Sequence, residues 1–225
     1  GENSGGRPIE ERLEVPKTEM FEKYGSRMRE ASSELVGVMK EMWANNEKKY
    51  NKNLDMAERL KAEAANTSLN DRRNQLLDEA TWGGKAINFR KQSSGESWSQ
   101  YSDYQRKELE EYNKAAMSDP YTVMRLAEAS QLGQGYGETE GIGRIDRKLR
   151  SNPEFMAKVL ENISKSGAES FWVHVAGEAK NKDLYLAAVK KNHLNYQWGA
   201  KEWKLEPEVQ KVALESGLDP MYLQR

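Results

Sequence analysis

The chain of 225 residues has no cysteine, only two histidines and only six prolines. The absence of cysteine excludes a disulfide framework and any cysteine-ligated zinc, haem or iron–sulfur site. No apolar run approaches the roughly 20 residues that a membrane-spanning helix needs. No hydrophobic secretory core follows Gly1, so no signal peptide is visible. We therefore expect a soluble chain, whose cellular location the sequence leaves open.

Charge of one sign is also missing, because 35 Lys and Arg nearly balance 36 Asp and Glu. A net charge of −1 argues against strong attraction of the whole chain to nucleic acid or anionic lipid. Charged residues make up 32 % of the chain and hydrophobic ones 37 %, which predicts a thin core and much solvated surface. Six Trp, ten Tyr and four Phe argue against full disorder.

A heptad pattern of apolar residues runs along residues 18–43 and is the clearest periodic feature of the chain. The spacing of alternately three and four residues predicts a helix with one apolar stripe that packs on another helix. We call this stripe the seam. It consists of Phe21, Tyr24, Met28, Ala31, Leu35, Val38 and Met42. All of these except Ala31 are the predicted partner interface, and the partner helix could lie in the same chain, a second copy or a larger assembly.

After Trp43 the apolar stripe changes frame, and Asn45-Asn46 lies at the change. This predicts either one long helix with a register shift, from about 18 to 65, or a helical hairpin with a tight turn. The long helix is the preferred interpretation. Asn66-Thr67-Ser68 is predicted to cap a second helix that Gly83-Gly84 ends, with 85–99 as a loop.

The N-terminal segment 1–17 is rich in Gly, Pro and charges and is predicted to be a flexible arm. The alternative is an arm that docks on a partner through Ile9, Leu13 and Val15. Residues 18–99 are expected to form the long helix or helical hairpin with its loop. Residues 100–225 are expected to form a small bundle of short helices, so that the fold class is all-α.

Three segments in this second region place Pro near the start of a helix and Gly just past its end, which is the expected asymmetry of helix termini. They are 118–133, 151–167 and 205–217. Their uneven spacing argues against a solenoid repeat. Further helices are predicted over 100–117, 168–180 and 183–193.

No motif in the sequence predicts catalysis or cofactor binding. The glycine-rich segment 133–143 lacks both the dinucleotide and the Walker spacing and reads as a flexible joint. His174 and Glu178 could share a helical face, with Glu169 or His193 as further ligands, but a structural histidine is the better explanation. We therefore predict no catalytic, metal-binding or cofactor-binding residue and a chain that is not an enzyme.

Cations and aromatic residues alternate between Arg144 and Lys204, where Lys and Arg outnumber Asp and Glu. Such a pattern can bind single-stranded nucleic acid by stacking and phosphate neutralisation. The candidate contacts are Arg147, Lys148, Arg150, Lys190, Lys191, Trp198 and Trp203. The favoured alternative is that the tryptophans fill a core while the lysines remain solvated.

The C-terminal segment Val209–Leu223 has a helix, Gly217 and the start signal of a further helix at Pro220. This spacing is similar to a helix-turn-helix element and to the opening helices of lysozyme-like transglycosylase domains. The second resemblance implies a catalytic glutamate after Arg225. We also expect the natural polypeptide to continue beyond that residue.

The function that these observations favour is a non-enzymatic assembly or interaction domain of a larger structural, secretion or virion-type protein. It would bind a protein partner or a second copy of itself through helices. A nucleic-acid-binding module and an accessory segment before a lysozyme-like domain are the alternatives.

Overall fold

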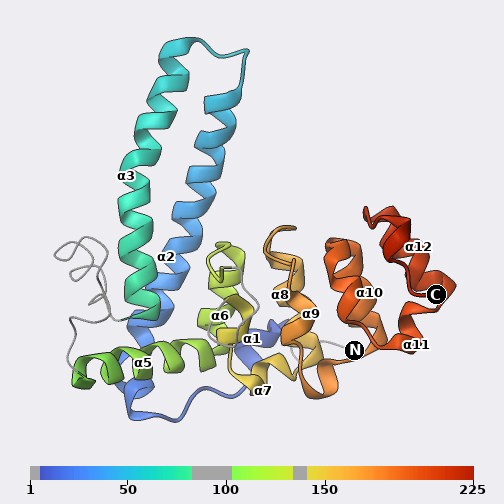
Figure 1. Ribbon diagram of the computed structural model, residues 1–225. Helices are drawn as coiled ribbons and strands as arrows, with labels where there is room; N and C mark the ends of the chain where they lie inside the picture. Colours follow the sequence, from blue (N-terminus) through green and yellow to red (C-terminus); the bar gives the residue numbers. More distant parts are fainter. Residues whose placement is uncertain (1–5, 83–102, 134–140) are drawn as a thin grey trace. The chain divides into compact units, whose positions relative to one another are not determined.

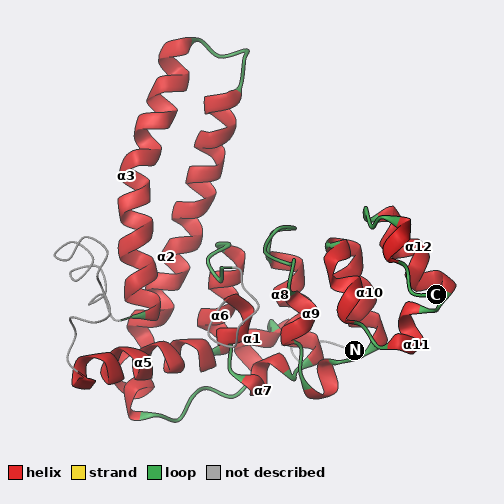
Figure 2. Cartoon of the chain, in the orientation of Figure 1, coloured by secondary structure: helices red, strands yellow, loops and turns green. Residues whose placement is uncertain are grey.

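The computed structural model describes residues 6–82, 103–133 and 141–225, and every regular element within them is a helix (Figures 1 and 2). The all-α prediction is confirmed. No helix in these ranges combines the length and the apolar character needed to cross a bilayer. The chain divides into two compact units, which we call the hairpin unit (15–129) and the stack unit (1–14 with 130–225). This differs from the expected boundary near residue 100.

The hairpin unit is built on two long helices that lie side by side and are joined by a short turn over 51–55 (Figure 1). Two shorter helices pack against the N-terminal half of the first long helix and the C-terminal end of the second. In chain order the four helices are α2 (Glu19–Tyr50), α3 (Met56–Thr81), α5 (Asp103–Ser118) and α6 (Pro120–Glu128).

The turn between α2 and α3 corrects the preferred prediction of one helix running to residue 65. Asn51 accepts a hydrogen bond from the backbone of Asn53 through its side chain, at 2.9 Å. Asp55 then caps α3 by accepting from the backbone N–H of Glu58 at 2.8 Å. The hairpin alternative is therefore correct, but its turn lies five residues after the predicted Asn45-Asn46.

The asparagines that suggested helix breaks instead join the two long helices side chain to side chain. Asn45 donates to the Asn66 side chain at 3.1 Å. Asn66 in turn donates to the Met42 carbonyl at 3.1 Å and to the Asn46 side chain at 3.0 Å. Asn66 therefore lies within α3, and the prediction that it caps a new helix is wrong.

The core of the hairpin unit is concentrated in its proximal half, near α5 and α6. Buried apolar residues of α2 end at Met39, and Ala62 is the only buried residue of α3 before Leu76. α5 and α6 contribute further side chains to the same core. They are Leu109, Tyr112, Ala115, Ala116, Met117, Val123, Met124, Leu126 and Ala127. Because α5 and α6 complete this core, they belong with the hairpin and not with the C-terminal bundle.

The stack unit consists of short helices and 3-10 turns. In chain order they are α1 (Ile9–Arg12), η3 (Gly141–Arg144), α7 (Arg147–Arg150), α8 (Pro153–Asn162), α9 (Phe171–His174), η4 (Gly177–Ala179), α10 (Lys182–Lys191), η5 (His193–Trp198), α11 (Lys201–Lys204), α12 (Pro207–Glu215) and η6 (Pro220–Tyr222). The helix predicted over 168–180 is therefore two separate short turns. The first follows a loop that Asn195 holds in place, and Ala176 bonds back to the Arg150 carbonyl.

Three helices of this unit pack in series, α8 on α10 and α10 on α12 (Figure 1). They begin at residues 153, 182 and 207. The uneven spacing of the three Pro-initiated segments argued against a repeat, but α10 lies between the last two of them and begins with Lys182 in place of Pro. Its N-cap is nevertheless equivalent, since Asn181 accepts from Leu184 N at 2.9 Å just as Asn152 accepts from Phe155 N at 2.9 Å.

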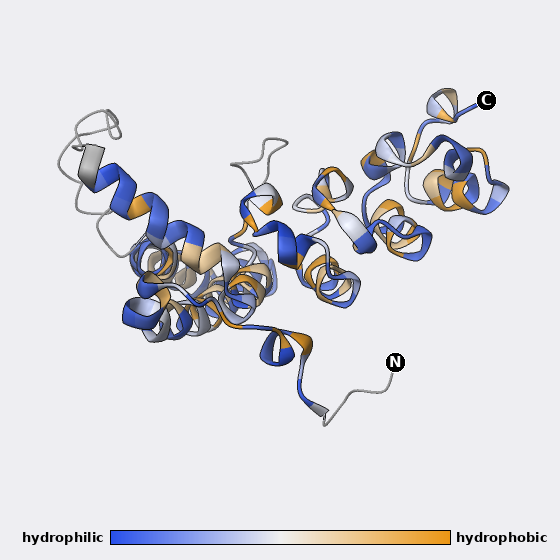
Figure 3. Ribbon diagram, turned by 90° about the horizontal axis from the view of Figure 1, so that it is seen from below, coloured by the Kyte–Doolittle hydropathy of each residue, from blue (hydrophilic) through white to orange (hydrophobic). Residues whose placement is uncertain are grey.

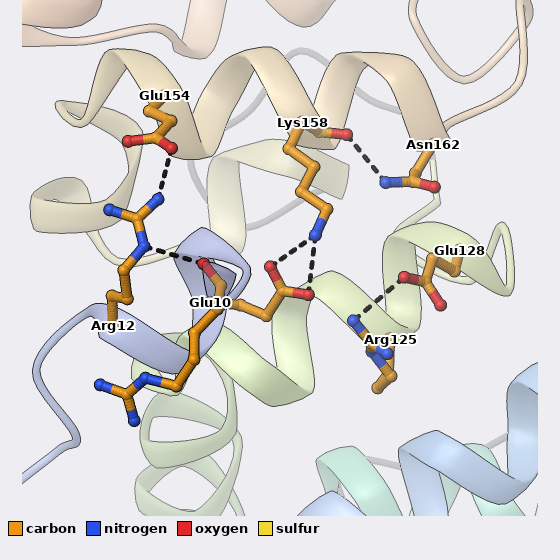
Figure 4. Close-up of polar contacts among 8 residues, drawn as sticks. Glu10, Arg12, Arg125, Glu128, Glu154, Lys158 and Asn162 are labelled. Atoms are coloured by element: carbon orange, nitrogen blue, oxygen red, sulfur yellow. Dashed lines mark hydrogen bonds and ion pairs between the residues drawn. The ribbon is translucent and has the colours of Figure 1, made fainter. Parts of the chain in front are cut away.

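The N-terminal segment is docked within the stack unit by one helical turn, α1. Ile9 is 6 % exposed, and the buried Glu10 accepts two hydrogen bonds from Lys158 of α8, at 3.0 and 2.8 Å (Figure 4). Arg12 pairs with Glu154 on the same helix. The described part of the arm therefore differs from the flexible arm that was expected, because an ion pair and a buried isoleucine hold it.

Asn195 is the polar centre of the stack unit and is fully buried. Its amide group donates to the carbonyls of Ala168, Ala188 and Asn192, and its oxygen accepts from the Trp172 backbone. These bonds join α9, α10 and η5. Since every polar atom of the amide is used, the side chain fixes one arrangement of the three elements.

Gly25 and Gly37 lie in the same long helix but in different surroundings. At Gly25 a Cβ would come within 2.8 Å of the Phe21 ring, whereas at Gly37 nothing lies within 4 Å. We expect Gly37→Ala to raise the free energy of unfolding by about 0.5–1 kcal/mol, because alanine is the better helix former. Gly25→Ala should be neutral or destabilising because the ring must move. Chemical denaturation followed by circular dichroism measures both, and equal stabilisation by both variants would contradict this packing.

Candidate interaction surfaces

The seam predicted from the sequence is covered within the chain. Met28 and Leu35 have no exposed surface, and Ala31 is 4 % exposed. The remaining members of the seam are half-buried. They are Phe21, Tyr24, Val38 and Met42. Of the three partners left open for the seam, the same-chain helices α3, α5 and α6 are the ones that cover it.

Tyr24 shows how the N-terminal end of the seam is used. Its ring lies 5.5 Å from the ring of Tyr112 on α5. The Tyr112 hydroxyl donates to the Glu79 carbonyl of α3 at 2.6 Å, and burial raises the pKa of Tyr112 to about 12. This end of the seam therefore joins three helices of the hairpin unit.

A buried ion pair joins α2 to α6. Asp119 has no exposed surface and accepts from Arg29 through Nε at 2.9 Å and Nη2 at 2.8 Å. The same carboxylate accepts hydrogen bonds from the hydroxyl and the backbone N–H of Thr122. Asp119 is therefore also the N-cap of α6. The Arg29 guanidinium also lies over the rings of Phe21 and Tyr121, 5.5 and 5.2 Å from their centroids. These contacts give the cluster a structural role, because they join α2 to α6 within the hairpin unit.

The distal half of the hairpin presents large apolar side chains to solvent. Trp43 is 38 % exposed, Tyr50 70 %, Met56 62 % and Leu60 55 %. Trp43 and Tyr50 are seven residues apart and so lie on one side of α2. Polar contacts join the two helices here, namely the asparagine cluster, a Lys49–Glu63 ion pair at 3.3 Å and a hydrogen bond from Arg59 to the Lys49 carbonyl.

These four residues were not predicted as a site from the sequence. Trp43 was noted only as the point after which the apolar stripe changes frame. The available signal was the break in the pattern itself. An apolar residue that leaves the frame of a buried stripe is a candidate for exposure.

An open depression of about 390 Å³ lies between the first turn of α2 and α5. Charged side chains of both signs dominate its lining, which comprises Glu19, Met20, Lys23, Tyr24, Lys107, Glu108 and Glu111. No histidine, serine or threonine is among these residues.

The candidate nucleic-acid contacts serve different purposes in the structure. Arg150 donates to the carbonyls of Ile145 and His174, and Lys191 donates to those of Leu160 and Glu161 at the end of α8. Burial lowers the pKa of Lys191. Three cations of the set remain exposed, and they are Arg147, Lys148 and Lys190.

The two tryptophans of this set are half-buried, and Trp203 belongs to a ring cluster. Its ring lies 6.0 Å from that of Trp172 and 5.5 Å from that of Tyr185. Gly199 allows this packing, because a Cβ there would lie 2.1 Å from Tyr185 Cζ. The ring of Trp203 therefore contacts other rings of the stack unit. Trp198 is not without a partner either.

The residues considered for a metal site are not assembled into one. His174 is 3 % exposed, whereas Glu178 is exposed to solvent. His193 Nδ1 lies 3.1 Å from the Ser216 carbonyl. Within the part of the chain that the structure describes, no three His, Cys, Asp or Glu side chains form a group able to hold a metal ion.

The segment Val209–Leu223 contains α12 followed by the three-residue 3-10 turn η6. The second α-helix that a helix-turn-helix element requires is therefore not formed by residues 218–223.

Comparison of the chain with protein-family models, with curated proteins and with solved structures finds no match.

The Arg29–Asp119 pair and the surface pair Arg72–Glu34 allow a matched test of burial. We expect Arg29→Met to lower the free energy of unfolding of the hairpin unit by about 3–5 kcal/mol, because it leaves Asp119 charged and buried. Arg72→Met removes an ion pair whose side chains are 39 % and 54 % exposed, and it should cost less than about 1 kcal/mol. Urea denaturation of both variants measures the difference, and similar losses would contradict the role given to Asp119.

Proposed function

We propose that this chain is a non-enzymatic helical interaction domain whose hairpin binds helices of another protein. The observation that carries the proposal is the exposure of Trp43, Tyr50, Met56 and Leu60 on the distal half of α2 and α3. Trp and Tyr are the side chains most often found at the energetic centre of protein interfaces.

The energetics of the hairpin support this function. Burying a large apolar side chain from solvent is worth about 1.5–3 kcal/mol, so covering four of them favours binding by several kcal/mol before the entropic cost of association. In the distal half, α2 and α3 pack on each other and on no other described helix of the hairpin unit. They therefore cannot cover these four side chains by themselves. A third or fourth helix would complete a bundle around the distal half.

The charges near the distal end of the hairpin do not favour a partner of either net charge. This part of α2 and α3 carries charges of both signs, among them Lys48, Lys49, Asp55, Glu58 and Lys61. Such a mixed rim fixes register more than affinity. Apolar contact is therefore the main source of binding energy in this proposal.

The alternatives have weaker support. Nucleic-acid binding would need the cations and tryptophans of residues 147–203 on one free face, yet Arg150, Lys191 and Trp203 make their contacts within the stack unit. An accessory role before a lysozyme-like domain rests on the segment 209–223 alone. We therefore keep the interaction domain as the proposal.

A photoreactive phenylalanine analogue at position 50 tests this function in the protein's own cells. We expect it to form a discrete cross-link to a helical segment of one partner, identified by mass spectrometry, because Tyr50 is 70 % exposed on the apolar side. The same analogue at Glu41, nine residues away and thus on the opposite side of α2, is the matched control.

A second variant shows whether apolar contact carries the binding. Replacing Trp43 by Ser, Met56 by Gln and Leu60 by Gln should abolish the cross-link from position 50 and leave helical content unchanged. Equal cross-linking from positions 50 and 41, no cross-link from either, or a cross-link that survives the triple variant would each contradict the proposal.

A further inference from the structure

The chain passes between its two units twice, and the first passage follows the docked turn α1. The stack unit takes residues 1–14 and 130–225, so the hairpin unit is an insertion between α1 and the rest of the stack. Residues 13–18 connect α1 to α2. A connector of this length spans at most about 25 Å, even when it is fully extended. The docked turn therefore limits where α2 can begin.

Opposite charges face each other along the docked segment. The sign alternates at every second residue, and a side chain of α7 or α8 opposes it each time. The pairs are Glu10 with Lys158, Arg12 with Glu154 and Glu14 with Lys148. A shift of the segment by two residues would place like charges together, so the charges define one register for docking.

The three ion pairs differ in burial. The side chain of Glu10 is 1 % exposed, and it accepts two hydrogen bonds from Lys158 (Figure 4). In the other two pairs at least one side chain is more than half exposed. Exposed ion pairs contribute little to stability, whereas a buried charge that loses its partner is costly. The docking of α1 therefore depends mainly on the pair of Glu10 and Lys158.

Loss of this pair is relieved most easily by undocking of α1. Ile9 is the only apolar residue that α1 buries, and a helix of four residues is not stable by itself. Without the charge of Lys158, Glu10 would stay buried without a counter-charge. Release of α1 returns the carboxylate to water and exposes one apolar side chain. The stack unit keeps its remaining helix contacts.

We propose that α1 is a latch that restricts the movement of the hairpin unit relative to the stack unit, and that the Glu10–Lys158 pair keeps it closed. With α1 docked, the hairpin unit is held at both of its ends, after residue 14 and before residue 130. With α1 released, only the second passage holds it, and the chain regains the entropy that closing this loop removes. The latch does not depend on the function proposed for the hairpin.

The absence of native cysteine allows spin labels to be placed at chosen exposed positions. Labels at Lys61→Cys in the hairpin unit and Lys211→Cys in the stack unit report the distribution of distances between the units by pulsed electron paramagnetic resonance. Lys158→Glu should broaden this distribution about twofold. A single label at Glu11→Cys should become mobile in the same variant, because α1 is released. Lys165→Glu makes the same charge change at an exposed position after α8 and should alter neither signal.

The double variant Glu10→Lys with Lys158→Glu reverses both charges and keeps their attraction. It should narrow the distance distribution again and immobilise the label at position 11. The inference is overturned if α1 stays docked in Lys158→Glu, if the distribution is unchanged once α1 is released, or if the double variant restores neither signal in a chain of native helical content. If Lys158→Glu lowers the helical content, Glu10→Gln takes its place, with the same expected and contradicting results.

Discussion

A helix with a single apolar stripe is stable in water only when another element covers that stripe, and the hairpin unit follows from this constraint. The stripe of α2 is covered by α3, α5 and α6, with Met28 and Leu35 completely removed from solvent. The buried apolar residues of α2 end at Met39, and beyond it α2 and α3 are joined by side-chain hydrogen bonds while Trp43, Tyr50, Met56 and Leu60 are exposed. The same principle explains the stack unit, in which each helix of the series covers the previous one.

Buried polar groups then select one arrangement among the many that apolar contact alone would allow. Figure 3 shows hydrophobic and hydrophilic residues interspersed along the helices, and an apolar face fixes which side of a helix is buried but defines its register along a neighbour only weakly. Asp119 with Arg29, Glu10 with Lys158 and the amide of Asn195 define this register, because each would be costly to bury without its partners.

Local signals in the sequence predicted much of this fold. Pro120, Pro153 and Pro207 mark helix starts as expected, because the first turn needs no N–H from proline. The turn of the hairpin was predicted at the wrong residues. An asparagine can end a helix, or it can form a hydrogen bond to a neighbouring helix. Only the position of the second helix shows which of these two roles it has. The exposed apolar residues of the distal half were missed for a related reason. The heptad pattern shows which residues share a face of the helix. It does not show how far along the helix the other helices of the unit cover that face.

α2 and α3 bury their apolar residues mainly near α5 and α6 and leave them exposed at the distal end, where we propose that a partner helix binds. Backbone hydrogen exchange of the unbound protein tests this difference most directly. The account predicts slow exchange for residues 28–39 of α2 and exchange at least tenfold faster for residues 43–50 of the same helix. Equal protection along the whole of α2 would contradict it.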